Sequence, residues 1–196
     1  MSRFFPVVYD LVMFPLERIW LGRIREALIS KGSGMILEIG AGTGANFPYY
    51  PMKIEKLIVI EPDPGMILRS GLLKASDHPV PVIVQSDAQS LPFAENTFDT
   101  IVATLVFCTI PDPLLALREA RRVLKPGGHL LLLEHVRLKG GLFSKIQDGL
   151  TPAWKHLAGG CHLNRDTLSL LKQAGFQIKI LSTLLGGLFV VVNAIS

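Results

Sequence analysis

The stretch MILEIGAGTGANF, residues 35–47, determines how the rest of the chain is organised. Residues 35–39 predict a short buried strand, and glycines follow it directly at positions 40, 42 and 44. Glycine is needed where a chain leaves a strand, turns sharply and brings bare backbone against a ligand, because it has no Cβ. Glu61 follows at the end of the apolar run LIVIEP, where a carboxylate suits the hydroxyl groups of a ribose. We therefore predict a βαβ unit that binds a cofactor containing adenosine.

The composition limits the classes of protein that need to be considered. A chain of 196 residues is the size of one domain with a substantial core. Hydrophobic residues make up 49% of it and charged residues only 18%, which fits a parallel sheet buried on both faces or a protein that also lies against a membrane. The net charge of +4 is scattered, and its one mild cluster (Arg118, Arg121, Arg122, Lys125) is expected on a solvated helix face, so no nucleic-acid partner is expected.

The first thirty residues are rich in apolar side chains, but Pro6, Asp10 and Pro15 interrupt them. No uninterrupted run approaches the roughly 20 residues that a membrane-spanning helix requires. A signal peptide is not expected either, since there is no basic start followed by a clean apolar segment and a cleavage site. The spacing of apolar residues over 16–29 predicts an amphipathic helix. Residues 1–30 are thus expected either to cap the cofactor cleft or to lie on a membrane surface, and we expect a cytoplasmic protein with or without peripheral membrane contact.

Beyond the glycine loop, apolar strands alternate with helices, which is typical of a parallel sheet covered on both faces. We predict an α/β fold with a Rossmann-like, doubly wound sheet of about seven strands, mostly parallel, with an antiparallel C-terminal strand. The single domain divides into a cofactor-binding core over residues 35–136, an insertion over 137–165 with little periodicity, and a C-terminal helix with strands over 166–196. Strands are predicted at residues 35–39, 56–60, 80–85, 98–105, 129–134, 176–181 and 188–193, and helices at 16–29, 64–73, 113–124 and 165–173.

The glycine turn alone does not distinguish between adenosine cofactors. Gly40, Gly42 and Ala45 satisfy the relaxed dinucleotide pattern G-x-G-x-x-A, so a nicotinamide oxidoreductase is a rival interpretation. Two carboxylates favour a different ligand. Glu38 lies inside the first strand, where its burial requires a cation or hydrogen-bond donors, and Asp87 ends the third strand, within expected reach of an adenine amine. With Glu61 they place three acidic groups and no nearby Arg or Lys at the carboxyl edge of the sheet, which favours a cationic nucleoside over a pyrophosphate.

Four segments resemble, in order, the motifs of class I S-adenosylmethionine-dependent methyltransferases, in the branch of ubiquinone and menaquinone biosynthesis. They are LEIGAGTGANF, VIEPDPGM, SDAQSLPFAENTFDTIVAT and EARRVLKPGGHLLLLEHV, which together cover about residues 35–136. Within this branch the chain is most similar to the methyltransferase-like proteins of thiol S-methylation. That likeness depends on GTGANF, TLVFCTI, LEHV and the late stretch TPAWKHLAGGCHLNRDT, residues 151–167. The resemblance implies S-adenosylmethionine as methyl donor, S-adenosylhomocysteine as product, and an apolar N-terminal region that touches membrane.

The resemblance also implies roles for individual residues. The glycine loop would frame the methionine part of the cofactor, Glu61 would bind the ribose, and the segment after the fourth strand would pass beneath the sulfonium. The implied cofactor-binding residues are Glu38, Gly40, Ala41, Gly42, Gly44, Glu61, Pro62, Met66, Asp87, Ala88, Thr104, Leu105 and Val106. A plain tight turn is the structural alternative for the glycines, core packing is the alternative for Met66, and helix capping is the alternative for Asp87.

Methyl transfer from a sulfonium is an in-line displacement, so the enzyme mainly has to align the reacting atoms. A base is needed only for a protonated nucleophile, and a thiol needs little help. We expect a small apolar acceptor, a thiol first and a lipid amine, phenol or quinone second. A cofactor-binding module without turnover remains a further alternative.

His135 is our candidate for the base, because it follows the fifth strand at the rim of the cleft; His162 and His156 are weaker candidates. The insertion is expected to carry acceptor specificity, because loops that break a regular alternation often do. Two cysteines are too few for a disulfide framework and indicate a reducing compartment. Cys108 is expected to be a packed core thiol, and no metal site is expected. The expected acceptor-binding residues are Trp154, Cys161, His162, Asn164 and Arg165.

Overall fold

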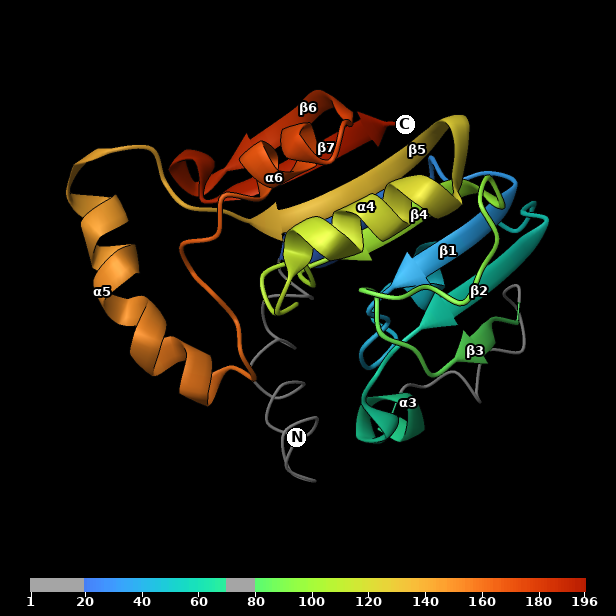
Figure 1. The fold of residues 1–196 in the computed structure, drawn as a ribbon, viewed down its shortest axis with the longest axis horizontal. Coiled ribbons are helices and arrows are strands. Elements are labelled where there is room, and N and C mark those ends of the chain that lie inside the picture. Colours follow the sequence, from blue (N-terminus) through green and yellow to red (C-terminus); the bar gives the residue numbers. More distant parts are fainter. Residues whose placement is uncertain (1–19, 70–79) are drawn as a thin grey trace.

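The computed structural model describes residues 20–69 and 80–196. Within them, seven strands form one sheet in the order β3-β2-β1-β4-β5-β7-β6 (Figure 1). Strand β7 runs antiparallel to its neighbours β5 and β6, whereas the pairs among β3, β2, β1, β4 and β5 are all parallel. This order confirms the predicted doubly wound sheet. The strands are β1 (Met35–Ile39), β2 (Lys56–Ile60), β3 (Val82–Val84), β4 (Phe98–Thr104), β5 (Leu124–His135), β6 (Gln177–Leu184) and β7 (Phe189–Ile195).

Helices cover both faces of the sheet, as its two buried sides require. On one side, alternate strand residues such as Leu37 and Ile101 pack in a core with α4 and α6; on the other, Ile36 and Val102 pack with Leu28 of α2. This alternation follows from the strand period of two. The helices are α2 (Gly22–Ile29), α3 (Pro64–Arg69), α4 (Pro113–Val123), α5 (Gly141–Leu157) and α6 (Thr167–Gln173), with short 3-10 turns η2 (Phe47–Tyr49) and η4 (Leu185–Gly187).

Most predicted boundaries lie within a few residues of the observed ones. Strand β3 is shorter than predicted, and β5 begins earlier, because residues before and after the KPGG turn both pair with β4. Helices α4 and α6 begin where Asp112 and Asp166 accept hydrogen bonds from backbone N–H groups three residues later. Residues 1–19 and 70–79 lie outside the described part of the chain, and with them most of the predicted N-terminal cap and the end of the predicted helix 64–73.

The prediction of an irregular insertion over residues 137–165 is wrong, because 17 of these residues form α5. Glycines and Pro152 argued for a loop, since proline removes a backbone donor from a helix interior. Pro152 has no N–H to donate to the carbonyl of Asp148, one turn earlier in the helix. At the neighbouring position, the Thr151 hydroxyl donates to the carbonyl of Gln147 at 2.6 Å. The signal missed is a repeat of four residues in the positions of Leu142, Ile146, Leu150 and Trp154.

Helix α5 is inverted relative to an ordinary surface helix, since its buried residues are polar: Ser144, Gln147 and Thr151. Its apolar residues are exposed instead. In Figure 1 the helix projects at the left edge of the molecule, away from the sheet. We call the exposed row Leu142, Ile146, Leu150, Trp154 and Leu157 the apolar stripe of α5.

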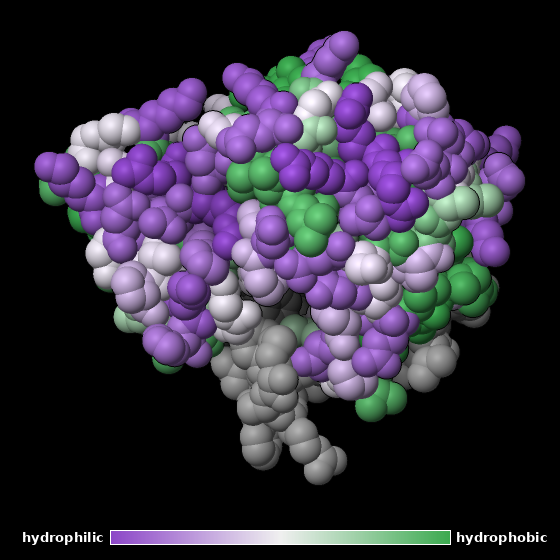
Figure 2. Space-filling model, in the orientation of Figure 1, coloured by the Kyte–Doolittle hydropathy of each residue, from purple (hydrophilic) through white to green (hydrophobic). Residues whose placement is uncertain are grey.

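The remaining surface carries apolar side chains mostly in separate patches among hydrophilic ones in the view of Figure 2. No helix among residues 20–69 and 80–196 has both the length and the apolar character needed to cross a bilayer.

Candidate active site

The glycine loop lies at the carboxyl edge of the sheet, where β1 and β2 end side by side and the N–H of Gly40 donates to the carbonyl of Ile60 at 2.9 Å. Gly40, Gly42 and Gly44 all have positive φ angles, of 70°, 55° and 85°. A Cβ on Gly40 would lie 2.2 Å from the side chain of Val106, so this glycine permits the loop to meet the segment after β4. A Cβ on Gly42 would meet nothing within 4 Å. The loop is therefore tight at Gly40 and open to a ligand at Gly42.

Glu61 is fixed against this loop by two backbone donors. Its Oε2 accepts from the N–H of Gly42 at 2.9 Å, and its Oε1 accepts from the N–H of Asp63 at 3.0 Å. Burial raises the pKa of Glu61, although both N–H groups favour the charged form. The carboxylate is thus preset where the sequence predicts the ribose hydroxyls.

The other predicted cofactor residues lie around the same edge. Met66 is buried at the start of α3, Pro62 is exposed, and Ala41 and Ala88 are buried. Both oxygens of Asp87 accept hydrogen bonds from Gln89, one from its backbone and one from its side chain, at 2.9 and 2.8 Å. Asp87 therefore stabilises its own turn, and its contact with adenine stays a prediction.

Glu38 is 1% exposed and is satisfied by the protein itself. Its Oε1 accepts from Asn46 at 2.8 Å and its Oε2 accepts from the Tyr50 hydroxyl at 2.7 Å. Arg25 of α2 donates to Asn46 at 2.6 Å and also to the hydroxyl of Thr104. The expectation of no Arg or Lys near the acidic groups is therefore wrong. Burial raises the pKa of Glu38 to about 7, against the opposing effects of Tyr50, Asn46 and Arg25.

Sequence reasoning missed these partners because they come from separate segments: α2, the end of the glycine loop and the turn before β2. Asn46 lies within the glycine motif and bridges two of these residues. Its side-chain amide donates to Glu38 and, at 3.0 Å, to the hydroxyl of Thr104. The network ties α2 to the carboxyl ends of β1 and β4. It therefore anchors the predicted N-terminal cap, as far as the structure describes it, at the rim of the cofactor cleft.

The segment after β4 is held by a buried carboxylate that the sequence reasoning also missed. One oxygen of Glu134 accepts from the N–H groups of Val106 and Phe107 at 2.6 and 2.7 Å. Leu105 has a φ of 56°, which is unusual for a residue with a side chain, and its N–H donates to the carbonyl of Leu133. Burial raises the pKa of Glu134 to about 7. Glu134 thus fixes the turn that the family resemblance places beneath the sulfonium.

His135 ends β5 beside this turn and lies against a cysteine from the insertion. Its Nε2 is 3.1 Å from the Sγ of Cys161, and its buried Nδ1 has no hydrogen-bond partner among the described residues. Cys108, in the turn after β4, donates weakly to the carbonyl of Leu105 at 3.6 Å. The ligand atoms of Cys108, His135 and Cys161 all lie within 4.8 Å of one another. Cys108 is buried, as the sequence predicts, and it also lies beside two other side chains that could bind a metal ion.

The three groups alter one another's protonation. The neighbouring Cys108 thiol, followed by the contact with His135, lowers the pKa of Cys161 despite its burial, whereas the proximity of Cys161, together with burial, raises the pKa of Cys108. Burial lowers the pKa of His135, but Cys161 and the Glu134 carboxylate outweigh it and leave a net increase.

The remaining predicted acceptor residues divide into two groups. Trp154 of α5 lies near enough to Cys161 to help lower the pKa of this thiol, so α5 contributes to its surroundings. Arg165 instead donates from its Nη1 to the carbonyls of Phe107 and Ile110 at 2.7 and 2.5 Å. Its Nη2 lies 3.0 Å from the Nδ1 of His162.

Asn164 donates to Asp148 of α5, which also accepts from Arg137. Asn164 and Arg165 thus fasten the insertion to the protein, and direct acceptor binding by them stays a prediction.

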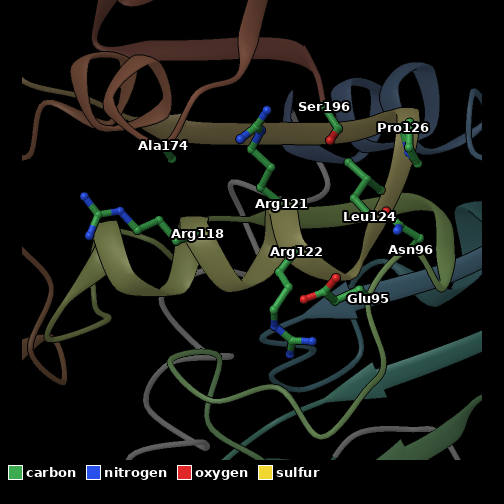
Figure 3. A pocket seen from close by; sticks show the side chains of 9 residues that line it. All are labelled: Glu95, Asn96, Arg118, Arg121, Arg122, Leu124, Pro126, Ala174 and Ser196. Atoms are coloured by element: carbon green, nitrogen blue, oxygen red, sulfur yellow. The ribbon is translucent and has the colours of Figure 1, made fainter.

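One hollow among the described residues lies away from this cluster. It has a volume of about 520 Å³ and is lined by Arg118, Arg121 and Arg122 of α4 together with Leu124 and Ser196 (Figure 3). Leu124 begins β5, and Ser196 follows the end of the antiparallel β7, so the hollow lies at the amino edge of the sheet. It is therefore at the opposite edge from the glycine loop, Leu105 and His135.

The residues at the carboxyl edge fit an S-adenosyl cofactor. Gly42 leaves open space for a close approach, Glu61 presents an oriented carboxylate, and Glu38 adds a second acidic group beneath the loop. Among these residues we find no cluster of basic side chains suited to a pyrophosphate. The donor set therefore suits a nucleoside with a positive charge better than a dinucleotide.

Comparisons with known proteins agree with this geometry. A family model described as a methyltransferase domain matches residues 37–132. The chain is 37% identical over 146 residues to thiol S-methyltransferase TMT1B of Rattus norvegicus, covering 72% of this chain and 59% of that protein. It is 31% identical over 177 residues to thiol S-methyltransferase TMT1A of Homo sapiens, covering 88% and 72%. The match to the rat protein thus spans less than two thirds of that relative's length.

A solved structure of a SAM-dependent methyltransferase from Aquifex aeolicus superposes with a TM-score of 0.71 at 18% identity, covering 100% of this chain and 98% of that one, and so shares the fold. The ordered motifs, the sheet and the sequence relatives agree on one family. The chain therefore belongs to the family of S-adenosylmethionine-dependent methyltransferases.

Proposed function

We propose that the protein methylates a small, apolar thiol. The observation that carries this proposal is the 3.1 Å contact between His135 and Cys161 beside the turn at Leu105–Phe107. A group that accepts a proton from a thiol is useful only next to the point of methyl delivery. The side-by-side carboxyl ends of β4 and β5 support that placement. The names of the relatives from rat and human support the same acceptor class.

When bound, the cofactor supplies an electrophilic methyl group on a sulfonium. The protein's own task is alignment, which can contribute on the order of 7–11 kcal/mol. As the acceptor sulfur took up the methyl group, the His135–Cys161 pair would accept the proton that the thiol gives up. Glu134 holds the turn after β4 in place through the N–H groups of Val106 and Phe107. The network of Arg25, Asn46 and Glu38 ties α2 to the carboxyl end of β1.

We further propose that the apolar stripe of α5 rests on a lipid surface. The stripe is exposed, its inner face is polar, and Lys145, Lys155 and His156 lie on the same helix while Asp148 is neutralised by Arg137. An amphipathic helix with basic flanks is the form that binds the headgroup region of a bilayer containing anionic lipid. Trp154 belongs to both the stripe and the site, so an apolar thiol dissolved in lipid would reach Cys161 by a short path.

The test of the transferase proposal is a panel of acceptors with methyl-labelled S-adenosylmethionine. An alkyl thiol and an aromatic thiol are expected to be methylated, with a phenol, a quinol and a phosphatidylethanolamine as the competing acceptors. Methylation of the phenol, quinol or amine in preference to both thiols would overturn the thiol assignment. Cosedimentation with phosphatidylcholine vesicles, with and without phosphatidylserine, tests the lipid contact, and no binding to either would overturn it.

A further inference from the structure

Cys108, His135 and Cys161 come from three separate parts of the chain and converge at one point. Cys108 lies in the turn after β4, His135 ends β5, and Cys161 follows α5. Each offers one sulfur or nitrogen ligand, and all three atoms lie within 4.8 Å of one another. Cys108 and Cys161 are free thiols, and both are buried. Two thiolates and an imidazole form a soft ligand set of the kind that selects zinc over magnesium or calcium.

We propose that Cys108, Cys161 and His135 form a Zn²⁺ site at the acceptor end of the crevice, and that occupation of this site inhibits methyl transfer. With three protein ligands, the fourth tetrahedral position is left for water or an acceptor atom, as in other three-ligand zinc sites. The proposed transferase reaction uses the metal-free form.

The geometry needs only a small adjustment to accept the ion. Zinc lies about 2.3 Å from sulfur and about 2.0 Å from nitrogen, so ligand atoms around one ion are about 3.5–3.8 Å apart. The widest separation in this cluster is within 4.8 Å, and His135 and Cys161 are already in contact at 3.1 Å. Side-chain rotations that move the ligand atoms by about an ångström would therefore bring them within reach of one ion, without movement of the strands. Because no hydrogen bond fixes Nδ1 of His135, the ring proton can remain there and leave the Nε2 lone pair for the metal.

The charges balance on binding. The cluster gives up two protons, one from the Cys108 thiol and the one that His135 and Cys161 share, and takes up one divalent cation. Two thiolates, one neutral imidazole and Zn²⁺ have no net charge, which suits a buried place. Around the cluster, the carboxylate of Glu134 and the guanidinium of Arg165 offset each other.

The inhibition, but not the metal site itself, rests on the function proposed above. The lone pair of Nε2 that would take the proton of an acceptor thiol is the same lone pair that binds the metal. Cys161 is likewise occupied. Metal binding and proton acceptance by this pair therefore exclude each other, and bound zinc would also fill the space next to the turn at Leu105.

Cobalt(II) tests the site directly, because tetrahedral coordination by thiolates gives strong visible d–d bands and near-ultraviolet charge-transfer bands. The full chain, kept anaerobic with a phosphine reductant, is titrated with Co²⁺ and then with Zn²⁺. We expect one equivalent of Co²⁺ to produce both band systems, one equivalent of Zn²⁺ to abolish them, and Mg²⁺ to leave them unchanged. Absence of the thiolate charge-transfer band, or its persistence in the variants below, would overturn the site.

The variants are Cys108→Ser, Cys161→Ser and His135→Ala, each expected to weaken Zn²⁺ binding at least tenfold. His156→Ala is the matched control, because His156 is an exposed histidine of α5 and no member of the cluster. Binding of S-adenosylhomocysteine by calorimetry verifies that each variant is folded, and Cys108→Ala replaces Cys108→Ser if the buried hydroxyl prevents folding.

Activity is measured separately with an alkyl thiol. Zn²⁺ at saturating concentration is expected to suppress turnover at least tenfold, and a chelator is expected to restore it. Faster turnover with Zn²⁺ would overturn the inhibition and leave the site in place. Cobalt bands without thiol methylation under any condition would refute the proposed acceptor, and not the metal site.

Discussion

The Nε2 atom of His135 lies 3.1 Å from the Sγ atom of Cys161, although 26 residues and a whole helix separate them in the chain. The contact places a histidine at the end of a central strand together with a cysteine from the insertion that follows it. It thereby joins the carboxyl edge of the sheet, where the cofactor is predicted, to the insertion over residues 137–165.

Replacing His135 by alanine is expected to lower kcat for an alkyl thiol by roughly 10²–10⁴-fold, the usual contribution of a positioned proton acceptor. The Kd for S-adenosylmethionine should stay the same, because no cofactor contact is removed. The loss should shrink as the acceptor thiol becomes more acidic, since a thiol that is already ionised needs no base. Rates across a series of substituted thiophenols measure this trend, and an equal loss for every thiol would contradict the role.

Glu61→Gln tests the preset carboxylate of the cofactor site. An amide has one NH₂ group, which cannot accept from the N–H of Gly42 or of Asp63, so one of the two hydrogen bonds must be lost. We expect the Kd for S-adenosylhomocysteine to rise at least about 30-fold, which corresponds to roughly 2 kcal/mol. Calorimetry measures it, with the exposed Glu55→Gln as control, and equal affinities for the two variants would refute the assignment.

Alanine at two neighbouring glycines should separate folding from binding. Gly40→Ala forces a Cβ to within 2.2 Å of Val106 at a φ of 70° and should lower the free energy of unfolding by roughly 2–4 kcal/mol. Gly42→Ala has open space around its Cβ and should cost only about 1 kcal/mol, from the positive φ. It should nevertheless weaken cofactor binding, because the methyl group enters the space where the ligand approaches. Urea unfolding and calorimetry measure the two effects, and a reversed order would contradict this account.

Glu38 should make the stability depend on pH. Burial raises its pKa to about 7 from the ordinary 4.5, so the folded protein binds a proton more tightly than the unfolded chain does. The free energy of unfolding should therefore fall as the pH rises from about 4.5 to about 7, and level off above that. The contribution of this one group is on the order of 3 kcal/mol. The charged and titratable groups that face it are Arg25, Tyr50 and Glu61.

Glu38→Gln should make this slope shallower without abolishing it, because Glu134 and Glu61 also have raised pKa values. Urea unfolding between pH 4.5 and 8 gives the slope for each variant. The exposed Glu55→Gln should leave it unchanged. A slope in Glu38→Gln equal to that of the original protein would show that Glu38 does not titrate in this range.

Leu142→Glu combined with Leu150→Glu should abolish binding to vesicles that contain phosphatidylserine, because both side chains belong to the apolar stripe of α5. The thermal midpoint should change little, since they are 69% and 55% exposed. Leu68→Glu is the matched control, an exposed leucine on α3 that is 79% accessible and lies outside the stripe. Equal loss of vesicle binding in the control would mean that added negative charge, and not the stripe, is responsible.

The sequence by itself determined the sheet and the cofactor edge. Strands that are buried on both faces consist of continuous apolar runs, and the residues that end them, such as Gly40, Glu61 and Leu105, must then meet at one edge whatever the remaining chain does. Local signals sufficed there because a parallel βαβ unit closes within a short length of sequence. The predicted antiparallel direction of the last strand is also confirmed.

Tertiary structure alone decided which groups satisfy the buried charges. Glu38 accepts hydrogen bonds from Asn46 and Tyr50, and the charge of Arg25 lies nearby. Glu134 holds a turn that lies 27 residues before it, and Cys108 lies beside Cys161 only because α5 returns the chain to the end of β5. The sequence reasoning missed helix α5 because Pro152 and the glycines disfavour a helix locally. These contacts join segments that are distant in the chain, and no local pattern specifies which donor will reach a buried carboxylate or thiol.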